Sequence, residues 1–220
     1  MVGFSHEKKA IARIGLKVDA WYLVRTPLEK PLYELALKHA ANAEASRKSG
    51  YQAEASRKSV CHKDELEHTI LAVILTATFM EAFINQQGIE LLGRDFHKYD
   101  EGYIDVYGNT FHKKRRYPKL EEKWSEITER LSNKQFDIGA EPFQGFKKLV
   151  ELRNKILHYK GMPDTPAPSP WPDVSGSVTP ERAEFNATAA QYSIKSMQGM
   201  LRKFSTLASK QLPNWMKQSV

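Results

Sequence analysis

The sequence predicts an all-α fold, a helical bundle of about five or six helices with at most a short N-terminal strand. Three observations support this prediction. Residues 66–92 carry apolar side chains at three- and four-residue spacing, which is typical of a helix that buries one face. Residues 32–61 are rich in Ala, Glu, Lys and Arg, which favour helix. Two further amphipathic segments, 119–131 and 142–159, each begin at or just after a proline.

The chain of 220 residues is long enough for one domain, with 41% hydrophobic and 27% charged residues. We expect residues 1–31 to form an N-terminal extension and residues 32–220 to form a single helical domain. Residues 10–24 show both helical and alternating apolar spacing, so a strand and an extra helix both remain open. Residues 43–49 and 53–59 share the sequence AEASRKS. The period of ten fits neither a seven- nor an eleven-residue supercoil, so we interpret this duplication as a lengthening of an exposed helix.

The other boundaries follow from proline and glycine positions. Gly93 is expected to end the longest apolar helix, and residues 94–117 are expected to form a long connection. Pro118 is expected at the first position of the next helix, where a proline loses no hydrogen bond. Six of the eleven prolines lie in residues 161–180, so this stretch is expected to cross the surface as an extended loop. The last helix is expected at residues 179–212.

The net charge of +7 permits RNA, DNA or an acidic protein as partner. The sequence has no run of 18 apolar residues and no apolar leader, and its single cysteine, Cys61, cannot form an internal disulfide. A cytoplasmic protein without a membrane anchor is therefore expected. There is no glycine-rich phosphate loop and no zinc-spaced cysteine set. His62 and His68 flank an acidic run, but their spacing of six gives no shared helix face, so neither a metal nor a cofactor is expected.

Two charges fall on apolar helix faces. Glu81 shares a face with the apolar residues of its helix, and Asn85 lies one turn further along. Arg153 lies within the apolar stripe of the 142–159 helix. A buried charge without a partner costs several kcal/mol, so we expect the two faces to meet and Glu81 to accept hydrogen bonds from Arg153. Such a pair can also serve only to fix the register of two helices.

The end of the 142–159 helix carries the hexapeptide RNKILH, residues 153–158. Asn154 and His158 are four residues apart and therefore lie together on the flank of the apolar stripe. Arginine binds phosphate through its planar guanidinium fork. Histidine has an unperturbed pKa of about 6.5, which suits it to move protons near neutral pH. Arg153, Asn154 and His158 are thus a candidate group for handling an anion.

This hexapeptide resembles the hallmark of HEPN domains, an Arg followed by a polar residue with a His a short step further on. The upstream segment TFMEAFIN, residues 78–85, resembles the helix that precedes the motif in several HEPN families. The likeness extends over residues 66–161 in order and character. It implies an α-helical bundle that dimerises and brings two copies of the Arg/His motif together in a cleft.

The same resemblance implies a function. Many HEPN proteins are metal-independent endoribonucleases of toxin–antitoxin, abortive-infection or other defence systems, whereas others are inactive or only bind RNA. Carried over to this chain, Arg153 binds the scissile phosphate and His158 is the general base or acid as the ribose 2′-hydroxyl attacks the adjacent phosphorus. Asn154 orients these groups and Glu81 holds Arg153. Toxins that a partner nucleotidyltransferase modifies carry a Tyr two residues after the His, and Lys160 stands there instead, so this regulation is not expected.

A basic segment precedes the helix at residues 119–131. Its cations are expected to contact RNA phosphates, and four aromatic residues nearby are expected to stack on bases. The cations are Lys113, Lys114, Arg115 and Arg116, and the aromatic residues are Tyr103, Tyr107, Phe111 and Tyr117. A solvated loop without a ligand is the alternative.

From the motif and its resemblance we expect an RNA-cleaving homodimer, with an antitoxin or other defence-system protein as a further partner. The alternatives are a non-catalytic helical module that binds RNA or protein, and a subunit of a larger assembly recruited through the lengthened helix.

Overall fold

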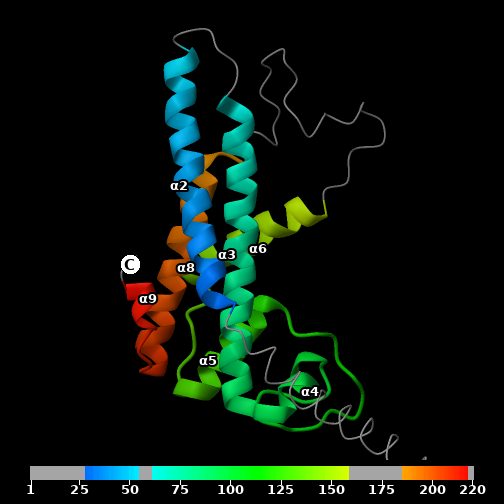
Figure 1. The fold of residues 1–220 in the computed structure, drawn as a ribbon. Coiled ribbons are helices and arrows are strands. Elements are labelled where there is room, and N and C mark those ends of the chain that lie inside the picture. Colours follow the sequence, from blue (N-terminus) through cyan, green and yellow to red (C-terminus); the bar gives the residue numbers. More distant parts are fainter. Residues whose placement is uncertain (1–27, 55–60, 159–184, 218–220) are drawn as a thin grey trace, which may run out of the picture.

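The computed structural model describes residues 28–54, 61–158 and 185–217, and it confirms the predicted all-α bundle. Helix α2 (Glu29–Glu54) and helix α3 (Cys61–Leu92) form a long antiparallel hairpin against which the other helices pack (Figure 1). The expectations for the N-terminal extension and for the proline-rich loop lie outside the described residues. Most of the second AEASRKS copy also lies outside them, after the end of α2.

Helix α3 is the centre of the bundle. It contacts α2, α5 (Leu120–Ser132), α6 (Phe143–Leu157) and α8 (Ala187–Ala208). Its regularly spaced apolar residues are buried as predicted, including Ala72, Val73, Ala77, Met80 and Ile84. By length and composition alone, the helical segment Lys63–Asp100 is apolar enough to cross a membrane, and 50% of its most apolar window is buried inside the bundle, as in a core helix.

Small side chains on α2 allow close contact within the hairpin. Ala36, Ala40 and Ala43 are at most 2% exposed. The distance between two packed helices falls with the size of the side chains between them. Close packing therefore also brings partly exposed residues at the edge of this contact, His39 on α2 and His68 on α3, within reach of each other.

Aromatic rings join α3, α5, α6 and α8 into one core around Trp124, which is fully buried on α5. Its ring stacks on Phe83 of α3, with centroids 5.6 Å apart. It also makes edge contacts with Phe146 of α6 at 5.8 Å and with Phe204 of α8 at 5.9 Å. The indole Nε1–H donates to the Met80 carbonyl at 3.2 Å, so this large side chain is buried with its polar atom satisfied.

The region after α3 differs from the long connection expected at residues 94–117. Gly93 has a φ of 57° and ends α3 as predicted, but the chain continues through a short 3₁₀ turn, η1 (Gly93–Asp95), into helix α4 (Phe96–Asp100). An isolated antiparallel bridge then joins Ile104 to Thr110. A helix of five residues is too short to show an apolar period, which explains why sequence reasoning missed it.

Helix α5 starts two residues later than the proline suggested. Lys119 is the N-cap, and its backbone N–H donates to the Glu122 carboxylate at 2.8 Å. This is the half of a capping box that does not require an N-cap side chain able to accept a hydrogen bond. Pro118 therefore precedes the cap and is not the first helical residue. Helix α6 does start at its proline, because Pro142 is the N-cap residue.

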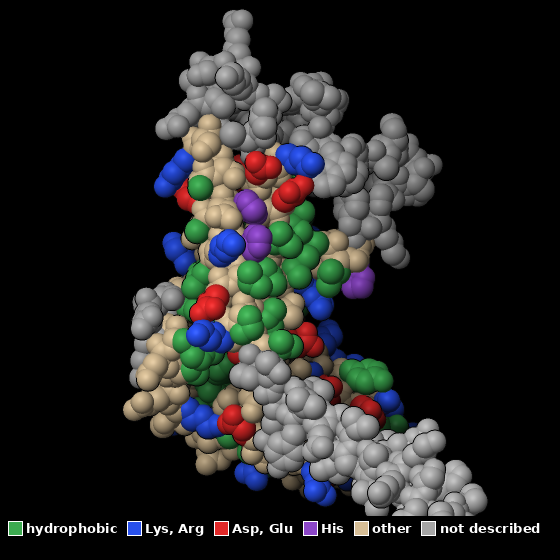
Figure 2. All heavy atoms as spheres, in the orientation of Figure 1, with side chains coloured by type: hydrophobic (Ala, Val, Ile, Leu, Met, Phe, Trp, Pro, Cys, Tyr) green, Lys and Arg blue, Asp and Glu red, His purple; other side chains and the backbone are tan. Residues whose placement is uncertain are grey.

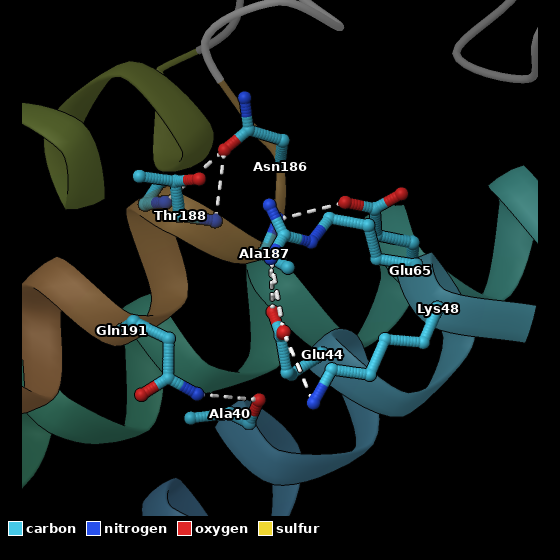
Figure 3. A network of polar contacts seen from close by, with 10 residues as sticks. Ala40, Glu44, Lys48, Glu65, Asn186, Ala187, Thr188 and Gln191 are labelled. Atoms are coloured by element: carbon cyan, nitrogen blue, oxygen red, sulfur yellow. Dashed lines mark hydrogen bonds and ion pairs between the residues drawn. The ribbon is translucent and has the colours of Figure 1, made fainter. Parts of the chain in front are cut away.

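Helix α8 is fixed to the hairpin through its first turn. The Asn186 side chain caps the helix by accepting from the N–H groups of Thr188 and Ala189, and a carboxylate oxygen of Glu65 on α3 accepts from the Ala187 N–H at 2.9 Å (Figure 3). Gln191 donates to the Ala40 carbonyl of α2 at 3.2 Å. The predicted start at residue 179 lies outside the described residues. The predicted end at residue 212 was wrong, because α8 ends at Ala208 and a separate short helix, α9 (Asn214–Lys217), follows.

Candidate functional site

The RNKILH segment occupies the C-terminal end of α6. This helix crosses α3, and its last turn projects to the side of the α2–α3 hairpin (Figure 1). Leu152 is 4% exposed, whereas Leu157 is 49% exposed and His158 is also exposed. The motif therefore sits where α6 leaves the core, and its polar side chains are open to a large ligand.

Asn154 connects the two other motif residues. Its side-chain Oδ1 accepts a hydrogen bond from Nη1 of Arg153 at 3.0 Å. Its backbone carbonyl accepts from the N–H of His158, the C-cap residue, at 2.9 Å. Arg153 is half-buried, while Asn154 is exposed. The Arg153 and Asn154 side chains are thus joined directly, whereas His158 is fixed to the same helix end only through its backbone.

The expected ion pair between Glu81 and Arg153 is not among the ion pairs of the described residues, so this prediction was wrong. The physical reason is the exposure of both side chains, each of which is only half-buried. Solvated charges do not incur the desolvation cost that makes a partner necessary. Glu81 lies on α3 without a described contact to the motif.

Asn85 has a different role from the one expected. Its Oδ1 accepts from Nζ of Lys123 on α5 at 3.0 Å. The Lys123 side chain is 7% exposed, and its ammonium also pairs with the carboxylate of Asp100 at the end of α4. Asn85 therefore supports a buried cation that joins α3, α4 and α5. Sequence reasoning did not identify Lys123, because nothing local distinguishes it from a surface lysine.

Two cations of the basic segment lie over three of the four expected aromatic rings, whereas Tyr107 lies under Arg130 of α5. Nζ of Lys114 lies over the rings of Tyr103, at 5.0 Å, and Tyr117, at 4.7 Å. Arg115 lies 3.9 Å from the ring centre of Phe111. Arg116 instead forms an ion pair with Glu122. The surface is therefore a set of exposed aromatic rings covered by cations, with one of its four predicted cations engaged by a carboxylate.

A cleft of about 460 Å³ lies beside this surface, between η1, α4 and the loop at residues 101–110, and Tyr103 forms part of its wall. None of the motif residues lines it. This cleft is thus next to the basic segment and separate from the RNKILH residues.

A tyrosine of α4 and a partly buried glutamate of α5 form a hydrogen bond. The Tyr99 hydroxyl donates to the Glu126 carboxylate at 3.0 Å. Burial raises the pKa of Glu126 above its usual value, against the opposing effect of this hydrogen bond. Burial and the neighbouring carboxylate also raise the pKa of Tyr99 strongly, so its hydroxyl keeps its proton. The pair joins α4 to α5 and underlies the loop that carries the aromatic rings.

Among residues 28–54, 61–158 and 185–217, no group of three or more His, Cys, Asp or Glu side chains is placed to hold a metal ion. In comparisons with known proteins, no protein-family model, no curated protein and no solved structure matches this chain. What the molecule does is therefore inferred from the positions and chemistry of its own side chains.

Proposed function

We propose that this protein is a HEPN-like, metal-independent endoribonuclease that cleaves RNA by attack of a ribose 2′-hydroxyl on the adjacent phosphorus. The observation that supports the proposal is that the bonded Arg153–Asn154 pair and the exposed His158 lie together in the last turn of α6. A guanidinium and an imidazole on one helix end provide the two groups that this reaction needs, a phosphate binder and a proton carrier.

Each residue has a defined task in this reaction. One N–H of Arg153 is used by Asn154, and its other donors are directed to the non-bridging phosphate oxygens, where negative charge builds up during attack. His158 takes the proton from the 2′-hydroxyl or gives one to the leaving 5′-oxygen. The attacking and leaving groups belong to one substrate, so the nucleophile is already close to the phosphorus. The products are a 2′,3′-cyclic phosphate and a free 5′-hydroxyl.

We also propose that the active form is a homodimer. The reaction needs a base at the 2′-oxygen and an acid at the 5′-oxygen, and the motif of one chain supplies a single histidine. Leu157, 49% exposed beside His158, is an apolar residue that a second α6 end can cover. Two copies that meet at this end place two Arg/His units in one cleft.

The biological setting proposed for this activity is a cytoplasmic toxin or phage-defence protein with an antitoxin or similar partner. Uncontrolled RNA cleavage harms the cell that performs it, so such an enzyme needs a partner or a trigger. The net charge of +7 and the exposed cations of residues 113–115 favour a polyanionic substrate.

The decisive experiment compares wild type with His158→Ala on structured RNA in the presence of a chelator. General acid–base catalysis contributes about 10²–10⁴-fold, so the variant is expected to cleave at least about 100-fold more slowly. His112→Ala is the matched control, because His112 is an exposed histidine outside the motif. Equal rates in wild type and His158→Ala, or no cleavage by either, contradict the proposed enzyme.

The dimer is tested with Leu157→Glu. A charge at this exposed position is expected to leave the chain folded, to shift the mass measured by light scattering from dimer to monomer, and to abolish cleavage. Leu28→Glu is the control, because Leu28 is 59% exposed at the start of α2 and away from the motif. A monomeric wild type that cleaves RNA refutes the dimer and leaves the chemistry of Arg153 and His158 standing.

A second candidate function is a non-catalytic RNA-binding module, and the cation-covered aromatic rings favour it. Lys114 between Tyr103 and Tyr117 is an arrangement that suits stacked bases and their phosphates. Replacing Lys113, Lys114 and Arg115 with Gln removes three cations. The slope of log K for single-stranded RNA binding against log salt concentration is expected to become less steep by about 2. Arg116→Gln is expected to have a smaller effect, because Glu122 already engages this side chain. If wild type binds RNA without cleaving it, the protein is a non-catalytic RNA-binding module. If the triple variant has the same salt dependence as wild type, this surface is not where RNA binds.

A further inference from the structure

Two histidines from different helices meet at the edge of the α2–α3 contact. Nδ1 of His39 on α2 lies 3.1 Å from Nδ1 of His68 on α3, although 29 residues separate them in sequence. The ring centres are 5.1 Å apart and the ring planes are inclined by 47°. Both side chains are half-buried, and Figure 2 shows histidine side chains gathered on the face over the hairpin.

The geometry of this contact suits a metal ion as well as a proton. In a neutral imidazole one ring nitrogen donates and the other accepts, so a proton between the two Nδ1 atoms is one way to satisfy the contact. Metal–imidazole bonds are about 2.0–2.1 Å long. With the two Nδ1 atoms 3.1 Å apart, an ion bonded to both has an N–metal–N angle of about 95–102°. This angle lies between the cis angle of a square-planar site and the angle of a tetrahedral site. The nitrogens therefore already have the spacing of two ligands of one ion.

The surroundings keep this pair rigid and available. The alanine face of α2 and the buried Ala72 of α3 hold the two backbones close together, so the ligands are positioned before an ion arrives. Burial, the neighbouring His68 and Lys38 all lower the pKa of His39. Metals bind the neutral form of imidazole, so a proton and a metal ion compete for this pair.

We propose that His39 and His68 form a two-imidazole site for a divalent transition-metal ion, Cu²⁺, Ni²⁺ or Zn²⁺, which joins α2 to α3. Imidazole suits all three ions, and the order of affinities favours Cu²⁺. No third His, Cys, Asp or Glu of the described residues is placed to join them, so water fills the remaining coordination positions. The site is separate from the RNKILH unit and is independent of the proposed RNA cleavage.

The binding test uses the full-length protein without an affinity tag, stripped with a chelator and titrated with Cu²⁺ by calorimetry. Wild type is expected to show one strongest site per chain. His39→Asn and His68→Asn keep a polar side chain of similar reach but remove the ligand, and each is expected to bind at least about 10-fold more weakly. His97→Ala, which removes an exposed histidine on α4, is expected to bind like wild type. Wild-type affinity in either Asn variant overturns the proposal.

Two further measurements distinguish this site from loose binding at surface histidines. The electron paramagnetic resonance spectrum of bound Cu²⁺ is expected to show two nitrogen ligands in wild type and one in each Asn variant. An ion that joins two helices also stabilises the fold, so Zn²⁺ at about 100 times its Kd raises Tm by roughly 5–10 °C in wild type. An equal rise in the Asn variants, or a nitrogen count that does not change, refutes the site. Circular dichroism in chelator verifies that the variants are folded.

Discussion

Replacing Asp100 with Asn is expected to destabilise the protein more than replacing its partner Lys123 with Met. The Lys123 side chain is 7% exposed and that of Asp100 is 40% exposed, so the cation is the buried member of the pair. In Asp100→Asn the Lys123 ammonium stays buried and has only neutral hydrogen-bond acceptors, one of which is the side chain of Asn85. In Lys123→Met the buried charge disappears, and the carboxylate remains in contact with water.

The magnitudes follow from this asymmetry. Removing one partner of a fully buried pair costs about 3–5 kcal/mol. Water already weakens the attraction at the half-exposed carboxylate, so we expect about 2–3 kcal/mol for Asp100→Asn. The Met side chain fills the apolar path of the lysine, so Lys123→Met is expected to remain within about 1 kcal/mol of wild type. The double variant is also expected within about 1 kcal/mol of wild type, because no buried charge is left to compensate.

Urea unfolding followed by tryptophan fluorescence measures all four proteins, with equal m values required for the comparison. Glu81→Gln is the matched control, because Glu81 is half-buried on the same helix as Asn85 and has no described ion pair, and it is expected to stay within about 0.5 kcal/mol of wild type. An Asp100→Asn variant that is as stable as Lys123→Met refutes the reasoning. A double variant whose free energy of unfolding falls by the sum of the two single effects refutes it as well.

Three further predictions concern the packing and the pH dependence of the bundle. Because burial raises the pKa of Glu126 from 4.5, the folded state holds this proton more tightly than the unfolded state, and stability is lost as pH rises through the folded pKa. Glu126→Gln still accepts from Tyr99, so it should raise the urea midpoint at neutral pH and lose this advantage below pH 4.5. Tyr33→Phe should stabilise the protein by about 1 kcal/mol in urea unfolding, because it removes a buried hydroxyl without a partner. Gly88→Ala should destabilise by about 1–3 kcal/mol in thermal unfolding, since the new Cβ would overlap the Phe96 ring.

The helices were predictable where the apolar period was long. Residues 66–92 and 119–131 show this period, and α3 and α5 cover nearly the same ranges. Helix α4 was missed because five residues span little more than one turn. The end of α8 was placed too late because Leu212 continues the apolar spacing, whereas Ser209, with a φ of 52°, breaks the helix before it.

The site was predictable only where its residues are adjacent in sequence. Asn154 contacts Arg153 and His158 within one turn of helix, so a local motif contains the whole unit. The contacts of Asn85 with Lys123 and of His39 with His68 span 38 and 29 residues and depend on how helices pack. A helical projection gives the direction of a side chain but not its depth. For this reason the projection placed Glu81 and Arg153 on apolar faces, whereas both side chains are half-buried and form no ion pair with each other among the described residues.

The division of α6 into an anchored and an unanchored part bears directly on how the motif works. Phe143, Phe146 and Leu149 are at most 2% exposed and fix the first half of the helix in the aromatic core. Beyond Leu152 the side chains are half-buried or exposed. The described hydrogen bonds there join the Arg153 side chain to that of Asn154 and the His158 backbone to the Asn154 carbonyl. Side chains held by one local bond retain rotamer freedom, and ordering them costs free energy that a bound phosphate or a second α6 end must offset. Asn154→Ala should therefore reduce cleavage while leaving the stability of the bundle within about 0.5 kcal/mol of wild type, because it loosens the motif without touching the core.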